Sequence, residues 1–175
     1  MTTTGDGRAS RWAGHREQRR EEIVERAVAV IDAEGADAPV ESIARACGVT
    51  RQVLYRQFDH RHDLDVAVAD RIVSMLLDHV IVRMTTDDGV EAGLRGTIDA
   101  YLDFVLEHRP LYDFVRALPA LRDVYATGLV GLADAVVSRW LADPGARTRE
   151  ELVDTLVDVL QLCIQPVLAQ AAGRT

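Results

Sequence analysis

Histidines and carboxylates gather in one stretch of the chain, where they raise the question of a metal site. The stretch reads Asp59-His60-Arg61-His62-Asp63. The two histidines are two positions apart, and residues at that spacing do not share a face of a helix. The carboxylates suit the first turn of a helix, whose positive end they stabilise. The pattern therefore favours the start of a helix over the ligand geometry of a metal ion, and we expect no metal site.

All 20 basic residues of the chain are arginines. Without lysine the chain cannot form a lysine Schiff base, anchor pyridoxal phosphate or complete a phosphate loop that ends in Gly-Lys-Ser/Thr. The chain also shows no catalytic Ser/His/Asp order and no typical carboxylate pair. Cys163 lies in an apolar run, where a cysteine is expected to be inert. We predict that the protein is not an enzyme and needs no cofactor.

Composition and charge are those of an acidic globular protein. The 175 residues carry a formal net charge of -8, and 48% of them are hydrophobic. An acidic chain does not normally suggest a nucleic-acid partner. Cys47 and Cys163 are far apart and provide no disulfide framework, which indicates a reducing compartment. The polar N-terminus and the lack of a long apolar run predict a cytoplasmic protein with no membrane partner.

Helices must position the functional residues, because helix-period patterns cover most of the chain and strand patterns are nearly absent. We therefore predict an all-α fold. The first helix carries an apolar stripe from Ile23 to Ile31 and is stopped by Gly35. The predicted helices are about Arg16–Glu34, Val40–Cys47, Arg51–Phe58, Arg61–Met84, Val90–His108, a short piece from Pro110 to Pro119, Ala120–Leu141 and Arg149–Ala171.

Two of these helices are short and joined at Gly48, which indicates a helix-turn-helix. Glycine adopts the left-handed turn conformation without a Cβ penalty. Ala44 is small where the helices cross, and Thr50 is placed as the N-cap of the second helix. In such a unit the N-terminal turn of the second helix points into a major groove. The small core between the helices would be filled by Ile43, Val49 and Leu54.

The complete string of residues is more specific than the two short helices alone. It comprises Ile43-Ala44, Gly48-Val49-Thr50, Leu54-Tyr55, Phe58, Arg61 and Leu64. From about Ile23 to Leu64 the chain resembles the N-terminal domain of the TetR family of transcriptional regulators (tetracycline-repressor-like). The resemblance implies a three-helix helix-turn-helix DNA-binding domain followed by a helical ligand-binding and dimerisation bundle. The expected divisions are a flexible basic arm (1–15), the DNA-binding domain (16–62) and the helical bundle (63–175).

The resemblance also implies which residues contact double-stranded DNA. The recognition helix begins with Arg51 and Gln52, and arginine can fork to guanine and glutamine to adenine. Tyr55 matches the family's phosphate-binding tyrosine, although a packing role is its alternative. Thr50 could also reach phosphate. Arg56 could contact phosphate or a base, or be a solvated surface charge.

Two positions depart from the family's usual pattern. Gln57 stands where the family has an aromatic residue or histidine. Arg61 stands where the family has lysine, and arginine can still bind phosphate, with two hydrogen bonds. Phe58 is expected in the core rather than at the DNA. The predicted DNA contacts are thus Thr50, Arg51, Gln52, Tyr55, Arg56, Gln57 and Arg61.

The last two long helices are too apolar for a single buried stripe, which predicts a second packing partner. The resemblance implies that this partner is a second copy of the chain. The expected residues of the homodimer interface are Leu129, Leu132, Val136, Trp140, Leu152, Leu156, Val159, Leu160, Cys163 and Val167.

By resemblance, the middle helices surround a pocket for an unknown small-molecule inducer, which we expect to be hydrophobic. Ordinary core packing is the alternative for every residue in this set. The candidate pocket residues are Leu94, Ile98, Tyr101, Leu102, Phe104, Tyr112 and Phe114.

The leading expectation is a dimeric repressor that binds a palindromic operator and is released by its ligand. One alternative is a regulator without ligand response, including an activator. Another is a helical interaction protein that has lost DNA binding. The net acidity weighs little against DNA binding, because most acidic residues lie beyond Leu64 and salt screens distant charges within ~10 Å.

Overall fold

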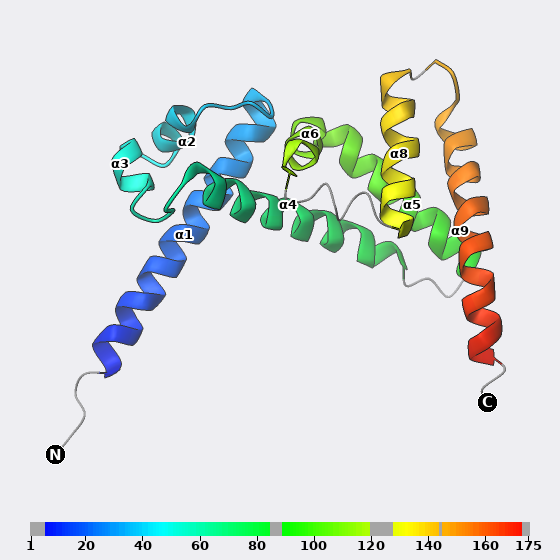
Figure 1. Cartoon of the computed structure of the whole chain (residues 1–175), viewed down its shortest axis with the longest axis horizontal. Helices are drawn as coiled ribbons and strands as arrows, with labels where there is room; N and C mark the ends of the chain where they lie inside the picture. The colour runs from blue at the N-terminus through cyan, green and yellow to red at the C-terminus, as the bar shows by residue number, and fades with distance from the viewer. Residues whose placement is uncertain (1–5, 85–88, 120–127, 144, 173–175) are drawn as a thin grey trace. The chain divides into compact units, whose positions relative to one another are not determined.

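The computed structural model describes residues 6–84, 89–119, 128–143 and 145–172, and in these ranges every regular element is a helix, as predicted (Figure 1). Side chains are described for the same ranges except residues 6–15, 84, 128–130, 132 and 162–172. The helices are α1 (Asp6–Glu34), α2 (Val40–Ala46), α3 (Arg51–Leu54), α4 (Arg61–Met84), α5 (Val90–Glu107), α6 (Arg109–Ala117), α8 (Gly128–Ala142) and α9 (Arg149–Ala172).

The chain divides into two compact units, and the division does not follow the sequence strictly. Unit 1 contains residues Met1–Ser74 together with His108–Val115, and unit 2 contains Met75–Glu107 and Arg116–Thr175. Helix α4 contributes its first part to unit 1 and its last part to unit 2. Most of α6, up to Val115, joins the predicted helix-turn-helix in unit 1, although it lies far beyond it in the chain. The boundary that we predicted at residue 62 therefore stays an expectation.

Helix α1 starts earlier than predicted. We expected a helix from about Arg16 and an arm before it, but the helix begins at Asp6. Alanine and arginine are strong helix formers, and Ala9, Arg11 and Ala13 favour extension of a helix that is already nucleated. Gly14 disfavours the helix by only about 1 kcal/mol. The predicted helix start is wrong for this reason, and residues 6–15 are helical.

Helix α3 is shorter than predicted. The expected helix ran to Phe58, whereas α3 ends at Leu54. Beyond it, the amide of Arg56 donates to the carbonyl of Val53 at 3.2 Å, and the amide of Gln57 donates to that of Leu54 at 2.9 Å. Hydrogen bonds between residues three apart tighten the chain relative to an α-helix. This tight turn precedes Phe58, which is buried.

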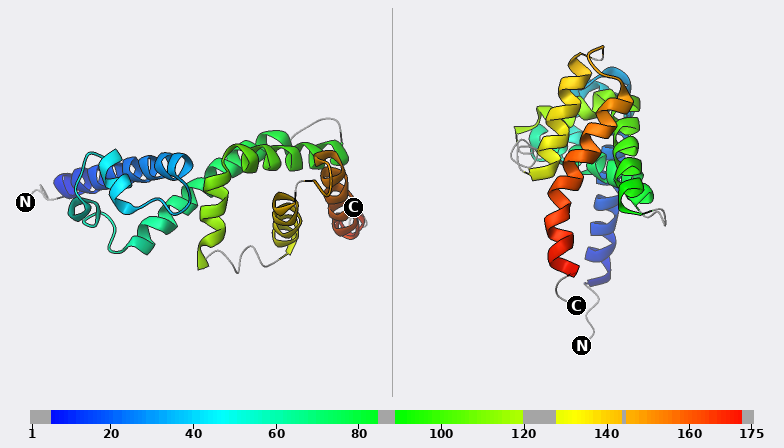
Figure 2. Two further views of the ribbon diagram at one scale, coloured as in Figure 1. Left: turned by 90° about the horizontal axis from the view of Figure 1, so that it is seen from above. Right: turned by 90° about the vertical axis from the view of Figure 1, so that its right-hand side faces the viewer.

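Unit 1 has a single apolar core that the short helices share with α1 and α4. The predicted stripe of α1 is confirmed, because Ile23, Ala27 and Ile31 are buried. Helix α2 packs against α1, and α3 packs against α2 (Figure 2). The other buried residues here include Ile43, Leu54, Phe58, Leu64, Val68, Leu111 and Val115.

Unit 2 is held together by α9, which packs against both α5 and α8 (Figure 2). The buried residues of α5 and α9 include Ile98, Leu102, Val105, Leu152 and Leu156. Arg149 joins the two helices through Asp99 at 3.1 Å and Asp103 at 2.6 Å. These ion pairs fix the register of α9 along α5 at the rim of the apolar contact.

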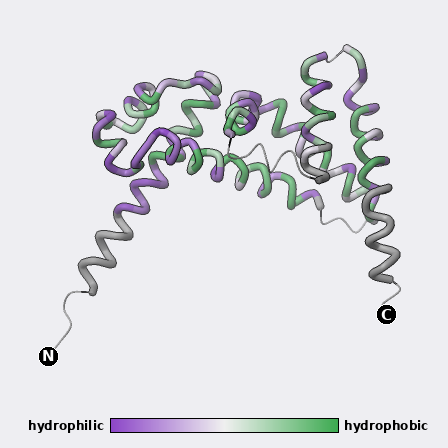
Figure 3. The backbone as a smooth tube through the Cα atoms, in the orientation of Figure 1, coloured by the Kyte–Doolittle hydropathy of each residue, from purple (hydrophilic) through white to green (hydrophobic). Residues whose placement is uncertain are grey.

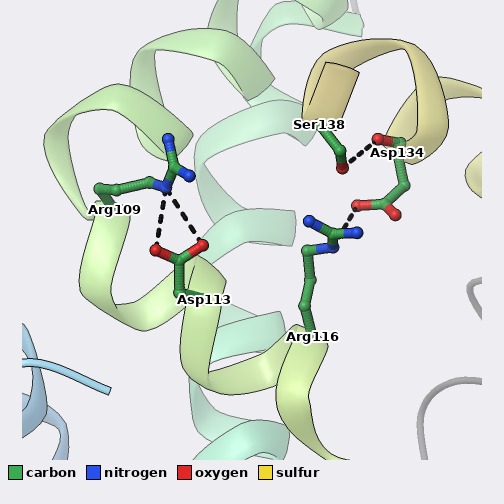
Figure 4. A network of polar contacts seen from close by, with 5 residues as sticks. All are labelled: Arg109, Asp113, Arg116, Asp134 and Ser138. Carbon is green, nitrogen blue, oxygen red and sulfur yellow. Dashed lines mark hydrogen bonds and ion pairs between the residues drawn. The ribbon is translucent and has the colours of Figure 1, made fainter. Parts of the chain in front are cut away.

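Polar contacts also organise α6 and α8 (Figure 4). Arg109 pairs with Asp113 one turn later on α6 at 3.0 Å. In unit 2, Arg116 pairs with Asp134 of α8 at 3.3 Å. Asp134 is buried, and a buried carboxylate requires such a partner. Among the described residues, none of the helices has both the length and the apolar character of a membrane span.

Candidate nucleic-acid interface

The turn between α2 and α3 is built as the sequence predicted. Gly48 has a φ of +65°, the left-handed conformation that its lack of a Cβ permits. Thr50 caps α3, since its hydroxyl oxygen accepts a hydrogen bond from the amide of Val53 at 3.3 Å. Ile43 and Leu54 are completely buried between the two helices. These contacts hold the first turn of α3 in a defined orientation.

Helix α3 presents polar side chains to solvent and one apolar side chain to the core. Arg51 and Gln52 are exposed, and so is Arg56 just after the helix. Leu54 has an exposure of 0%, which anchors the helix from its other side. Figure 3 shows that the chain from α3 to the start of α4 is largely hydrophilic. The two predicted base-reading residues are thus adjacent, accessible and mounted on a fixed helix.

Arg51 is held at two points in the structure. Its Nη1 atom donates to Oε1 of Glu41, in the first turn of α2, at 2.7 Å. Its guanidinium carbon lies 5.7 Å from the centre of the Tyr55 ring. Tyr55 is half-buried, so it both packs and supports Arg51. The sequence analysis missed Glu41, although a carboxylate in the helix that precedes an exposed recognition arginine was a usable signal.

Arg61 is engaged within the protein. Its Nε atom donates to Oδ1 of Asp65 at 2.7 Å, and its Nη2 atom donates to the carbonyl of Ala38 at 3.4 Å. The side chain is 35% exposed, and a guanidinium has five N–H donors. Arg61 therefore links α4 to the loop before α2. Its predicted phosphate contact stays a prediction.

The start of α4 is capped as the sequence analysis expected. Asp63 accepts a hydrogen bond from the amide of His60 at 2.9 Å through its Oδ2 atom. The carboxylate thus satisfies an amide that the helix leaves without a partner. In the part of the chain that the structure describes, no group of three or more histidine, cysteine, aspartate and glutamate residues could hold a metal ion.

Arg20 contacts the turn that follows α3, and the sequence patterns did not lead us to expect this role. Its Nη1 atom donates to the carbonyl of Gln57 at 3.0 Å. Its guanidinium carbon lies 4.2 Å above the centre of the Phe58 ring. Gln57 itself is half-buried. The usable signal was spacing, because Arg20 lies one turn before Ile23 on the face of α1 that is buried.

The candidate pocket residues do not all fall in one unit. Tyr112 and Phe114 are buried in α6, in the part of that helix that belongs to unit 1. The remaining five lie on α5 in unit 2, where Ile98, Leu102 and Phe104 are buried and Leu94 and Tyr101 are half-buried. The role of all seven residues in ligand binding stays a prediction.

The candidate dimer residues divide by burial. Leu152 and Leu156 are buried within one copy of the chain, so they belong to the core of unit 2. Val136, Trp140, Val159 and Leu160 keep part of their surface exposed and remain available to a partner. The side chains of Leu129, Leu132, Cys163 and Val167 lie outside the described residues.

Cys47 is the C-cap of α2 and is a free thiol. Burial raises the pKa of this thiol, although the charges of Arg19 and Arg26 act in the opposite direction. A thiol with a raised pKa is largely protonated near neutral pH, and only the thiolate is a good nucleophile.

Residues 23–68 match the sequence profile of the bacterial regulatory proteins of the tetR family. Two proteins of Mycobacterium tuberculosis, from strains CDC 1551 / Oshkosh and H37Rv, are similar to the chain. Each is described as an uncharacterized HTH-type transcriptional regulator and is 34% identical over 119 residues, or 67% of this chain. The chain spans about half the length of these relatives, with 50% of each covered.

Proposed function

Because the chain belongs to the tetR family of bacterial regulatory proteins, we propose that it regulates transcription by binding double-stranded DNA at specific sequences. The observation that carries this proposal is that α3 has one buried apolar side chain and exposed polar side chains. Leu54 is completely buried, whereas Arg51 and Gln52 at the start of the helix are exposed. Arginine and glutamine are the side chains that fork to guanine and adenine in a major groove.

The finer proposal is a homodimer that represses transcription from a palindromic operator. Two recognition helices about one turn of DNA apart (~34 Å) read the two halves of a palindrome. The half-exposed Val136, Trp140, Val159 and Leu160 supply apolar surface for such pairing on α8 and α9. A second copy would place two sets of DNA contacts on the operator, which no single α3 helix can do.

Release by a small hydrophobic ligand completes the proposal. The ligand would bind beside α5, where Ile98, Leu102 and Phe104 form an apolar group. A ligand that favours one arrangement of the two recognition helices changes operator affinity by a coupling free energy of typically 1–3 kcal/mol. A regulator without ligand response, or an activator, would bind DNA equally well but would show no such coupling.

The test is an electrophoretic mobility shift with the full chain on DNA upstream of its own gene and of the neighbouring genes, repeated in rising salt. We expect a discrete complex that competitor DNA of random sequence does not displace. Its affinity should fall steeply with salt, because arginine–phosphate contacts release counterions. Binding that is equally strong on every duplex would contradict sequence-specific regulation. Absence of binding would favour a helical interaction protein.

A further inference from the structure

Glu41 forms an ion pair with Arg51, the predicted guanine reader. It lies in the first turn of α2, and its Oε1 atom accepts from Nη1 of Arg51 at 2.7 Å. Arg51 starts α3, so the pair joins the exposed starts of the two short helices. The Glu41 side chain is 53% exposed and the Arg51 side chain is 59% exposed, so a duplex could reach both.

The contact leaves Arg51 able to read a base. A guanidinium carries five N–H donors, and the ion pair uses the Nη1 group. Donors remain to fork to O6 and N7 of guanine, the bidentate contact that specifies this base. The guanidinium of Arg51 also lies over the ring of Tyr55, with 5.7 Å between its carbon and the ring centre. An arginine held in this way loses less rotamer freedom when it binds, so it is pre-organised.

The pair has little value for stability. Exposed ion pairs contribute little to folding, because water screens the charges and two long side chains must be ordered. Glu41 also places a negative charge next to a residue that would face phosphate groups, which weakens binding to any duplex. The opposing benefit is orientation, because a carboxylate that accepts from Arg51 restricts the directions in which the guanidinium points.

We propose that Glu41 is a positioning residue that holds Arg51 for the readout of a guanine and thereby sets base preference at one position of the binding site. This inference rests on the proposed function, because it assumes that α3 reads DNA. Glu41 makes no base contact itself. Its effect acts through Arg51 and disappears when Arg51 is removed.

The experiment uses the full chain and a library of duplexes with a random central segment, from which the wild type selects its preferred sequence. Arg51→Ala then identifies the base pair that Arg51 reads. Affinities of the wild type, Glu41→Gln, Arg51→Ala and the double variant are measured on the four base pairs at that position and on a random duplex. Glu25→Gln is the control, since Glu25 pairs with Arg71 elsewhere in unit 1.

We expect Glu41→Gln to reduce discrimination at that base pair by about tenfold, within the range of one bidentate contact. Affinity for the random duplex should not fall, and Glu41→Asp should restore part of the preference. In the Arg51→Ala background, Glu41→Gln should change no preference, and Glu25→Gln should behave as the wild type. Thermal unfolding of each variant establishes that it is folded.

Three results would overturn the inference. The first is an unchanged preference in Glu41→Gln, and the second is an equal loss of affinity for selected and random duplexes, as a merely structural role would give. The third is a change in preference that persists without Arg51. If the wild type selects no sequence at all, the proposed function fails together with this inference. If it selects a sequence that Glu41→Gln reads equally well, only the role of Glu41 fails.

Discussion

Arg51 and Gln52 are neighbours in the chain but have different surroundings. Arg51 is held by Glu41 at 2.7 Å and lies above the ring of Tyr55. Gln52 is exposed beside it. At the scale of single residues, the predicted interface thus consists of an arginine held by an ion pair, one neutral side chain beside it and a cap, Thr50, at the helix start.

Arg51→Ala should weaken binding to the preferred duplex by about 1–3 kcal/mol and relax base preference at one position. The reason is the loss of a bidentate contact with a base. A contact with phosphate cannot replace it, because phosphate contacts carry no sequence information. Fluorescence anisotropy on single-base-pair variants measures both effects. Arg109→Ala, which removes an exposed arginine paired with Asp113, is the control. Unchanged affinity and preference in Arg51→Ala would show that Arg51 does not read a base.

Thr50→Ala should lower the free energy of unfolding by about 1 kcal/mol, because the amide of Val53 loses its side-chain acceptor. Thr50→Ser keeps the hydroxyl and should remain close to the wild type. Urea unfolding of the three proteins provides the comparison. A loss of similar size in both variants would mean that the methyl group, and not the cap, is the stabilising part of Thr50.

At the scale of elements, the turn at Gly48 and the length of α3 decide in which direction the predicted DNA contacts point. Helix α3 ends at Leu54, and hydrogen bonds between residues three apart then tighten the chain as far as Gln57. Arg20 closes this segment from α1 through the carbonyl of Gln57 and the ring of Phe58. The segment from Arg51 to Phe58 is therefore supported at its start by α2 and at its end by α1.

Gly48→Ala should destabilise the protein by about 1–2 kcal/mol, because a Cβ is disfavoured in the left-handed conformation at φ +65°. No atom lies within 4 Å of the added Cβ, so the penalty comes from the backbone alone. Gly96→Ala in α5 should have the opposite sign and stabilise by about 0.4–1 kcal/mol. Its Cβ would meet the Arg83 carbonyl at 3.5 Å, an ordinary contact. Denaturant unfolding measures both, and a stable Gly48→Ala would contradict the strained turn.

At the scale of the whole molecule, the predicted DNA contacts and the expected dimer surface belong to different units. The predicted DNA contacts lie in unit 1, whereas α8 and α9 lie in unit 2. Most of the acidic residues follow Leu64, so the net charge of -8 does not describe the surface around α3. The charge of the whole chain is thus a poor guide to its partner.

Val159→Glu should dissociate the proposed dimer, because it places a charge on the half-exposed apolar surface of α9. Sedimentation velocity at micromolar concentrations measures the change. Val82→Glu is the control, since Val82 is 71% exposed and lies outside the predicted interface. Leu152→Ala should instead lower the stability of unit 2 by about 2–5 kcal/mol, because Leu152 is 1% exposed. A dimer that Val159→Glu leaves intact would place the interface elsewhere.

Local patterns in the sequence were enough to predict the all-α class, the positions of most helices and the turn at Gly48. These features depend on local physics: helix periodicity, the left-handed glycine and the cap at Thr50 are set by residues close together in the chain. The start of α1 was mispredicted because it depends on cooperative extension of a helix rather than on a sharp signal. The end of α3 was mispredicted because a tight turn precedes a buried Phe58, which packs against distant parts of the chain.

Contacts between residues that are distant in the sequence became visible only in the tertiary structure. The contacts of Glu41 with Arg51, Arg20 with Gln57 and Arg61 with Ala38 join residues 10, 37 and 23 positions apart. The burial of Leu152 and Leu156 within one copy was likewise invisible in their apolar pattern, which suits a core and an interface equally. A pattern of residue types shows that a face will be covered, whereas the packing of helices decides what covers it.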